Sequence, residues 1–284
     1  MRLLEARVRP IVEMAVFEDL GLGDVTTSSL VSEEQRATGV FLSKDEGVLA
    51  GLSVSALVFA TIDPSIHMEF HLQDGDPLAR GTRIAVVEGP AASILGAERV
   101  ALNFLQRLSG IATLTARFVR AVEGYQVRIV ETRKTTPGLR LLEKYAVVVG
   151  GGSNHRQNLA DGVLIKDNHL AAAKAAGLTL EDAIARVRSK TAHTLRIEVE
   201  VTSLDEAKRA ADAGAEVILL DNMPPAEMAK AVALLGQRVV LEASGGITLE
   251  NVREVAATGV HIISVGALTH SAPALDISLE FELS

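Results

Sequence analysis

Basic side chains are concentrated in one stretch of an otherwise acidic chain. The 284 residues carry a formal net charge of -8, yet one short span contains Arg133, Lys134, His155, Arg156 and Lys166. Arginine presents a planar fork to carboxylates and phosphates, and lysine adds a compact positive charge. Three consecutive glycines at 150–152 indicate a loop that moves or that approaches a ligand closely. We therefore predict an active site for a small polyanionic substrate; a solvated charged face is the alternative.

Carboxylates alternate along one predicted strand. Glu198 and Glu200 are two residues apart in the segment LRIEVEV, so both side chains point to one face of a sheet. Burial of two carboxylates is costly unless they meet cations or a metal ion. Asp221 ends the apolar run VILLD, and a Glu and an Asp from neighbouring strands suit Mg²⁺ that retains several water ligands. We predict a magnesium site here; an exposed edge strand with solvated glutamates is the alternative.

Two glycine-containing segments end the last two predicted strands. They are Ala243-Ser244-Gly245-Gly246 and Val265-Gly266-Ala267. In α/β barrels this position often binds phosphate through backbone N–H groups and a helix N-terminus. A Ser-Gly-Gly segment by itself is more often a plain turn, so the prediction rests on its place in the fold.

Six apolar or β-branched segments alternate with Ala-rich amphipathic segments after residue 124. The predicted strands are VRIVETR at 127–133, GVLIKD at 162–167, LRIEVEV at 195–201, EVILLDN at 216–222, RVVLEAS at 238–244 and HIISVGAL at 261–268. Such repetition implies parallel strands with right-handed crossovers. A doubly wound sheet would carry a glycine fingerprint after its first strand, which the sequence lacks, whereas polar residues end all six strands, as in an α/β barrel. We predict an incomplete TIM-like barrel of about six parallel strands.

The first 112 residues follow a different pattern. A helix is predicted to end near residue 20, and short strands are predicted at 40–42, 47–52, 66–72 and 83–88, which would form a small, mostly antiparallel sheet. A long helix starts at Ser93, with an expected break at Ser109-Gly110. We expect an α+β domain at 1–112, the barrel at 113–270, and a segment at 271–284 that packs back on the first domain.

Composition excludes several classes of protein. Hydrophobic residues make up 48% and charged residues 23%, which is typical of a globular chain, and the lack of cysteine excludes disulfides and thiolate metal sites. Neither a signal peptide nor a membrane span is predicted. The acidic balance argues against non-specific binding to nucleic acid or membrane. We expect a cytoplasmic protein.

Several long motifs together resemble the quinolinate phosphoribosyltransferase family. They are EDLGLGDVTT at 18–27, AERVALNFLQRLSGIAT at 97–113, TRKTTPGLRLLEKYAV at 132–147, GGGSNHRQNLADGVLIKDNH at 150–169, LLDNM at 219–223, EASGGI at 242–247 and ISVGALTHSAPALDISL at 263–279. The resemblance covers nearly the whole chain. It implies transfer of phosphoribose from phosphoribosyl pyrophosphate to quinolinate, with loss of CO₂ and pyrophosphate, to give nicotinate mononucleotide for NAD synthesis.

The resemblance also implies roles for individual residues. Quinolinate carboxylates would bind Arg133, His155, Arg156 and Lys166, and Arg99 matches an arginine that the family supplies from the partner subunit of a homodimer, or of a higher oligomer. The implied catalytic residues are Lys134, Lys166, Glu200 and Asp221, of which Glu200 and Asp221 hold Mg²⁺, partly through water and substrate. Glu198 is the alternative to Glu200. The full implied substrate-binding set is Arg99, Thr132, Arg133, Lys134, His155, Arg156, Lys166, Glu198, Glu200, Asp221, Ser244, Gly245, Gly246, Ser264, Val265, Gly266 and Ala267.

Three other functions are compatible with the same residues. One is a related phosphoribosyltransferase for a different acid, such as the paralogue associated with molybdenum transport genes. The second is a barrel enzyme that forms a Schiff base on Lys166. The third is a regulatory barrel that binds a phosphorylated metabolite without turnover.

Overall fold

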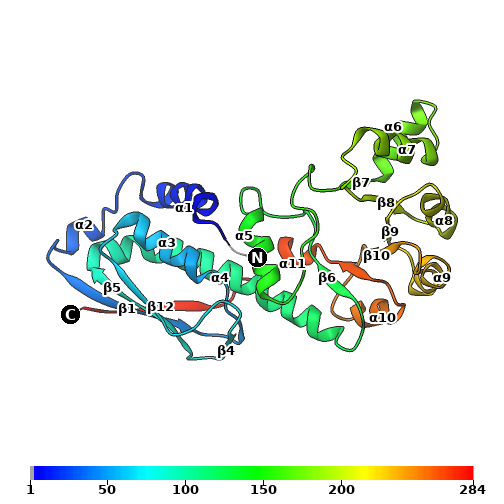
Figure 1. Ribbon diagram of the computed structural model, residues 1–284. Coiled ribbons are helices and arrows are strands. Elements are labelled where there is room, and N and C mark those ends of the chain that lie inside the picture. The colour runs from blue at the N-terminus through cyan, green and yellow to red at the C-terminus, as the bar shows by residue number, and fades with distance from the viewer. Residues whose placement is uncertain (1–2, 284) are drawn as a thin grey trace. The chain divides into compact units, whose positions relative to one another are not determined.

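The chain forms two compact units in a computed structural model that describes residues 3–283 (Figure 1). The first unit comprises residues up to Ala116, Thr135–Gly151 and the segment from Leu268, and the second comprises Arg117–Lys134 and Gly152–Ala267. These units are interleaved along the chain, whereas the sequence-based boundaries divide it at 112 and 270. Residues 135–151, which we expected in the barrel domain, are part of the first unit.

The first unit contains a four-stranded antiparallel sheet. The strands β1 (Arg36–Ser43), β3 (His67–Phe70), β5 (Arg83–Pro90) and β12 (Ile277–Leu283) are ordered β12-β1-β5-β3. Alternate residues of β1 are buried, as expected for a sheet with one face against a core. The C-terminal segment therefore lies in the sheet beside β1.

The predicted strand at 47–52 is wrong for most of its length. Only β2 (Gly47–Val48) is extended, and it pairs with β4 (Pro77–Leu78) in a separate two-stranded sheet. Gly51 has φ +104, a left-handed conformation that glycine adopts without strain, and the helix α3 (Leu52–Ile62) begins directly after it. The sequence of α3 does not indicate a helix, because it is rich in apolar and β-branched residues. Its burial on several sides removes a clear helical period.

The predicted break at Ser109-Gly110 is also wrong. Helix α4 (Ala91–Ala121) runs through it without interruption. A Cβ on Gly110 would lie 1.9 Å from the carbonyl oxygen of Pro273, so the glycine permits a close backbone approach within the first unit. The Ser109 hydroxyl is buried and accepts the N–H of Ala50 at 3.0 Å. The other helices of this unit are α1 (Glu5–Leu20), α2 (Thr27–Leu30), α5 (Arg140–Val149) and most of α11 (Ala267–His270).

The second unit contains six parallel strands, all at predicted positions. They are β6 (Arg128–Val130), β7 (Val163–Ile165), β8 (Ile197–Val201), β9 (Val217–Asp221), β10 (Val240–Ser244) and β11 (Ile262–Ser264), ordered β6-β11-β10-β9-β8-β7. Successive pairing of β7 to β11 is the order of a barrel, and β6 and β7 form its two open edges. The prediction of an incomplete six-stranded TIM-like barrel is confirmed.

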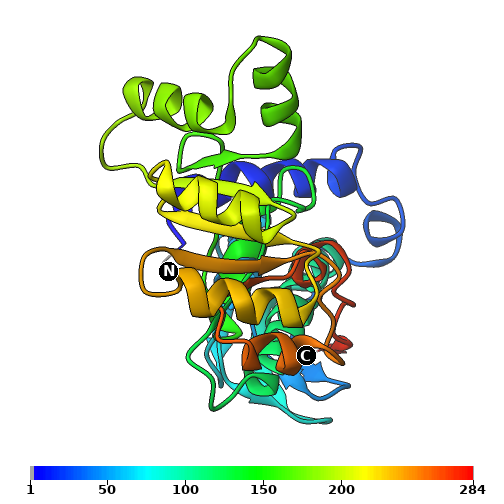
Figure 2. The same cartoon turned by 90° about the vertical axis from the view of Figure 1, so that its right-hand side faces the viewer.

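Helices cover one face of this sheet. Figure 2 looks onto α8 (Leu204–Asp212), α9 (Pro225–Leu235) and α10 (Val252–Ala257), which lie in front of the strands, while α6 (Asp167–Ala175) and α7 (Leu180–Lys190) follow β7. Side-chain caps start two of them: Thr179 accepts the N–H of Asp182 at 3.1 Å, and Ser203 accepts that of Glu206 at 3.3 Å. Because the strands are parallel, their carboxyl ends lie at one edge of the sheet, where we expect the site.

Within residues 3–283, no helix combines the length and the apolar character that crossing a membrane requires.

Candidate active site at the carboxyl ends of the strands

Two arginines of the second unit are near enough for their charges to repel each other. Arg133 follows β6, and Arg156 lies in the loop before β7. Burial lowers the pKa of Arg156, and so does the positive charge of Arg133, while Glu198 opposes both effects. The Nε of Arg133 is buried and finds no hydrogen-bond partner within residues 3–283. Two repelling guanidinium groups and a buried donor are an arrangement suited to binding an anion.

A cation and a carboxylate meet at the ends of β7 and β8. Lys166 Nζ donates to Glu200 Oε2 at 2.7 Å, and the backbone N–H of Lys166 donates to His169 Nδ1 at 2.9 Å. The side chain of Lys166 is 45% exposed and that of Glu200 is 12% exposed, so this ion pair borders open space. Lys134 is exposed, and its backbone N–H donates to the Thr132 hydroxyl at 3.1 Å.

Asp221 is held at the end of β9 by its neighbour. Asn222 Nδ2 donates to Asp221 Oδ2 at 2.9 Å, and Asn222 adopts φ +52, the single positive φ among the described residues other than glycine. Gly245 also has a positive φ, and a Cβ there would lie 2.3 Å from Asn222 Oδ1. Asn222 therefore connects the predicted metal ligand to the glycine loop, a role that the sequence did not indicate.

The two predicted phosphate loops follow β10 and β11, which are neighbouring strands. Ser244 is opposite both Asp221 and Ser264 in the parallel register. Gly245 and Gly246 have φ +88 and +62, and the Gly246 carbonyl accepts Asn251 Nδ2 at 2.8 Å. Glycine adopts such positive φ angles without strain, and its lack of a Cβ allows a ligand to approach the backbone closely. The loop at 264–267 begins at the same edge.

A second group of residues, which we call the inner cluster, lies deeper in the sheet. It consists of His155, Glu198 and Glu242. His155 Nε2 lies 3.3 Å from Glu198 Oε2 and 3.6 Å from Glu242 Oε1, and both carboxylates are buried. Burial raises the pKa of Glu242 to about 7, and so does the charge of Glu198, against the opposing effects of His155 and the Ser264 hydroxyl.

Sequence reasoning placed Glu242 at a strand end but did not assign it to the site. The same holds for Glu131, which is fully buried and whose Oε1 accepts the backbone N–H of His155 at 3.0 Å. A usable signal was present in both cases, since each is an acidic residue that directly follows an apolar strand run. Burial of such a residue implies a partner.

The inner cluster borders a cavity of about 420 Å³. Its wall includes Arg156 and residues at the beginnings of four strands: Arg128, Val163, Val217 and Ile262. Glu198 lines this cavity, whereas Glu200 does not and pairs with Lys166 instead. The two glutamates of β8 therefore have different surroundings.

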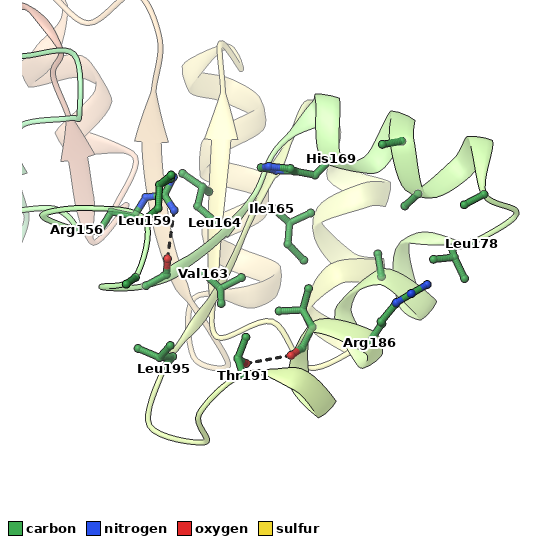
Figure 3. A pocket seen from close by; sticks show the side chains of 17 residues that line it. Arg156, Leu159, Val163, Leu164, Ile165, His169, Leu178, Arg186, Thr191 and Leu195 are labelled. Carbon is green, nitrogen blue, oxygen red and sulfur yellow. Dashed lines mark hydrogen bonds between the residues drawn. The ribbon is translucent and has the colours of Figure 1, made fainter.

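A larger pocket of about 800 Å³ lies among β7, α6 and α7 (Figure 3). Figure 3 shows Arg156 and His169 at its border and Val163, Ile165 and Leu195 in its wall, with Arg156 Nη1 donating to the Gly162 carbonyl at 3.2 Å. Its lining is largely aliphatic. A polyanion would lose hydration against this aliphatic lining, and the basic side chains Arg156 and Arg186 are its main polar partners, so most of this pocket does not suit the predicted substrate.

Arg99 belongs to the first unit, in α4, and is not part of the residues just described. Its side chain is 62% exposed and approaches Glu98 at 3.8 Å, a distance typical of a weak surface pair.

The fold is an incomplete α/β barrel whose strand ends carry basic side chains, carboxylates and glycine-containing loops. Two family models cover most of the chain: "Quinolinate phosphoribosyl transferase, N-terminal domain" matches residues 24–109, and "Quinolinate phosphoribosyl transferase, C-terminal domain" matches residues 111–280. The chain therefore belongs to the quinolinate phosphoribosyltransferase family.

Individual relatives agree with this assignment. A "Probable nicotinate-nucleotide pyrophosphorylase [carboxylating]" of Bacillus subtilis is 45% identical over 98% of this chain and 94% of its own length. A "Quinolinate phosphoribosyltransferase [decarboxylating] 2b, mitochondrial" of Nicotiana tabacum is 40% identical over 97% of this chain and 82% of its own. The crystal structure of NadC from Streptococcus pyogenes, 39% identical, superposes with a TM-score of 0.95 and covers 100% of this chain and 99% of that one.

Proposed function

We infer that this chain is an enzyme that transfers phosphoribose from phosphoribosyl pyrophosphate to quinolinate. The products are nicotinate mononucleotide, pyrophosphate and CO₂, a reaction of NAD biosynthesis. The observation that carries the inference is the pair Arg133 and Arg156. Their guanidinium groups repel each other, and the buried Nε of Arg133 has no hydrogen-bond partner within residues 3–283. Quinolinate, a ring with two adjacent carboxylates, supplies the anions that such a pair requires.

The basic residues bind and orient the acid in this proposal. Arg133 and Arg156 hold the two carboxylates, and Lys166 and Lys134 add positive charge at the same edge. His155 differs from the others because protein groups already engage both of its ring nitrogens: Nδ1 accepts the N–H of Arg156 at 2.7 Å, and Nε2 faces Glu198. We therefore propose that His155 acts on the substrate through Arg156.

The acidic residues act on the sugar side. Loss of pyrophosphate builds positive charge on the anomeric carbon, which carboxylates nearby stabilise. Glu200 and Asp221 offer hard oxygen ligands at the carboxyl ends of neighbouring strands, a donor set that fits Mg²⁺. Mg²⁺ bound there would neutralise the leaving pyrophosphate. Of the two glutamates of β8, Glu200 fits this role better, because Glu198 belongs to the inner cluster.

Bond formation and decarboxylation then require positioning rather than a protein nucleophile. The quinolinate nitrogen attacks the anomeric carbon as pyrophosphate leaves. The ring nitrogen is then cationic and accepts the electron pair released when the adjacent carboxylate departs as CO₂, and a proton takes its place. The loops at 244–246 and 264–267 would hold the 5′-phosphate through backbone N–H groups.

We also propose that the active enzyme is a homodimer to which Arg99 contributes from the neighbouring subunit. Two features of the first unit support this: Arg99 is largely exposed, and so are several large apolar side chains between residues 14 and 30, namely Met14, Phe17, Leu22, Val25 and Leu30. Exposed apolar groups that cluster in one segment are typical of an interface. A cysteine-free chain suits the cytoplasm, which we propose as its location.

The decisive experiment mixes the purified protein with quinolinate, phosphoribosyl pyrophosphate and Mg²⁺ and measures nicotinate mononucleotide and CO₂. We expect both products in equal amounts. The absence of product, with both substrates shown to bind, would contradict the proposal and would favour a binding protein. The variant Arg156→Lys serves as a specificity control, since it keeps the charge but loses the planar fork, and should weaken quinolinate binding far more than phosphoribosyl pyrophosphate binding.

A further inference from the structure

The inner cluster contains two buried carboxyl groups, and an oxygen of one lies within 4.8 Å of an oxygen of the other. Glu242 stands in the middle of β10, between the fully buried Leu241 and Ala243, and is 2% exposed. Glu198, on β8, is 7% exposed. The Oε1 atoms of both are buried and have no hydrogen-bond partner within the described part of the chain. Two ionised carboxylates in this arrangement would repel each other with little solvent to screen them.

A proton held by Glu242 resolves both problems. A protonated Glu242 donates to Glu198, which then remains the single charged carboxylate beside His155. The charge of Glu198 on β8 favours a protonated Glu242, because it opposes a negative charge on the Glu242 carboxyl group. His155 and the Ser264 hydroxyl, from the loop and from β11, favour ionisation less strongly than burial opposes it.

The hydrogen bonds of His155 fix the tautomer of its ring. Its Nδ1 accepts the backbone N–H of Arg156 at 2.7 Å, so Nδ1 carries a lone pair and Nε2 carries the proton. This Nε2–H lies 3.3 Å from Glu198 Oε2. The three side chains are close enough to surround a metal ion, but an ion on Nε2 would need the lone pair that the proton occupies. The cluster is therefore a proton-sharing group.

We propose that Glu242 is a positioning residue for the reaction inferred above: it holds Glu198, Glu198 holds the ring of His155, and that ring holds the backbone of Arg156. Glu131 completes the support by accepting the N–H of His155. The direction of the Arg156 guanidinium, and thus the binding of a substrate carboxylate, then depends on a carboxyl group in the middle of β10. The effect of Glu242 on substrate binding rests on the proposed function. Its effect on the ring of His155 rests on geometry alone.

Two substitutions separate the parts of this proposal. Glu242→Gln keeps the shape and a neutral donor, so it should preserve the cluster. Glu242→Leu keeps the volume but leaves Glu198 Oε1 with no donor, and we expect the KM for quinolinate to rise about tenfold or more. The KM for phosphoribosyl pyrophosphate should change by less than about twofold, because its proposed ligands lie outside the cluster. Glu216→Gln is the control: Glu216 precedes β9, pairs with Arg188 and does not touch the cluster, and its substitution should leave both constants unchanged.

The second measurement is independent of activity. In protein with ¹⁵N-labelled histidine, the ring signals of His155, identified by their loss in His155→Gln, should report a proton on Nε2 in the wild type and in Glu242→Gln, and a mixture of tautomers in Glu242→Leu. An unchanged tautomer and an unchanged quinolinate KM in a folded Glu242→Leu protein would overturn the proposal. So would a stoichiometric Zn²⁺ or Mn²⁺ retained by the wild type and lost from Glu242→Gln. If the wild type does not turn over quinolinate, the proposed function fails, and the ring signals still decide the role of Glu242.

Discussion

Glu198 and Glu200 lie on the same strand and point to the same face, but their surroundings differ. Glu200 ends near the carboxyl edge of the sheet, where it receives the ammonium group of Lys166 at 2.7 Å beside open space. Glu198 lies one layer deeper, next to His155 and a second buried carboxyl group. Whether a carboxylate binds a ligand or positions other side chains therefore depends on its depth in the sheet, rather than on residue type or spacing.

The largest expected effect concerns the outer residues and the neighbouring subunit. Arg99→Ala and Lys166→Ala should each reduce activity to about 1% or less, because each removes a charge-assisted contact to a desolvated anion. When the two proteins are mixed and exchange subunits, activity should return to about a quarter of the wild-type value, since half the dimers are mixed and each has one intact site.

Recovery is measured as nicotinate mononucleotide formed before and after exchange. Lys174→Ala, at the exposed end of α6, is the matched control for loss of a lysine and should remain active. Confirmed exchange without recovery would show that Arg99 does not act across a dimer.

A smaller effect should distinguish the two glutamates of β8 directly. Glu200→Gln should raise the Mg²⁺ concentration required for half-maximal activity about tenfold, because a carboxylate ligand is replaced by a neutral amide. Glu198→Gln should leave the Mg²⁺ requirement unchanged and raise the KM for quinolinate instead. Titration of activity with Mg²⁺ and with quinolinate separates the two, and the same response from both variants would remove the distinction between layers.

The last effect is on stability rather than activity and concerns the inner layer alone. The pKa of Glu242 is raised to about 7, chiefly by burial, from an ordinary value of 4.5. Between these pH values the folded protein retains a proton that the unfolded chain has released, so this group lowers the free energy of unfolding as the pH rises, and its full cost is present above pH 7. Glu242→Gln avoids that cost. Relative to the wild type, it should gain stability on the order of 2 kcal/mol between pH 5 and pH 8.

Denaturant unfolding at a series of pH values measures this difference. Glu216→Gln is a control of opposite sign: burial opposes the shift, but the ion pair with Arg188 lowers the pKa of Glu216. Relative to the wild type, Glu216→Gln should become less stable as the pH rises through the acidic range. Parallel stability curves for the wild type and Glu242→Gln would contradict the shared proton.

Much of the second unit could be predicted because its sequence pattern is local. Each strand is a short apolar run with polar residues at its carboxyl end, and amphipathic segments lie between most of them. The six strands and their functional ends could therefore be assigned without tertiary information. The shared face of Glu198 and Glu200 follows from the period of a strand alone. Which of the two approaches Glu242 depends on how β8 and β10 are staggered, and no local pattern encodes that stagger.

Other features escaped prediction for related reasons. Helix propensity predicts a break at Gly110. The glycine is needed instead because the carbonyl group of Pro273, more than 150 residues away in sequence, approaches it closely. The role of Asn222 could not be seen either, since its side chain lies against Gly245, which follows a different strand. The ring orientation of His155 depends on a backbone N–H and on two strands.

The pairing of β12 with β1 has a consequence for the order in which the protein acquires its structure. On one side of β1, the positions from Ala37 to Ser43 pair with residues 277–283, which follow all six strands of the second unit in the chain. Contacts so distant in sequence form late, because the loop that they close is long. The six strands of the second unit are synthesised before that point. We therefore expect nascent chains truncated before β12 to protect the second unit from proteolysis while β1 remains cleavable.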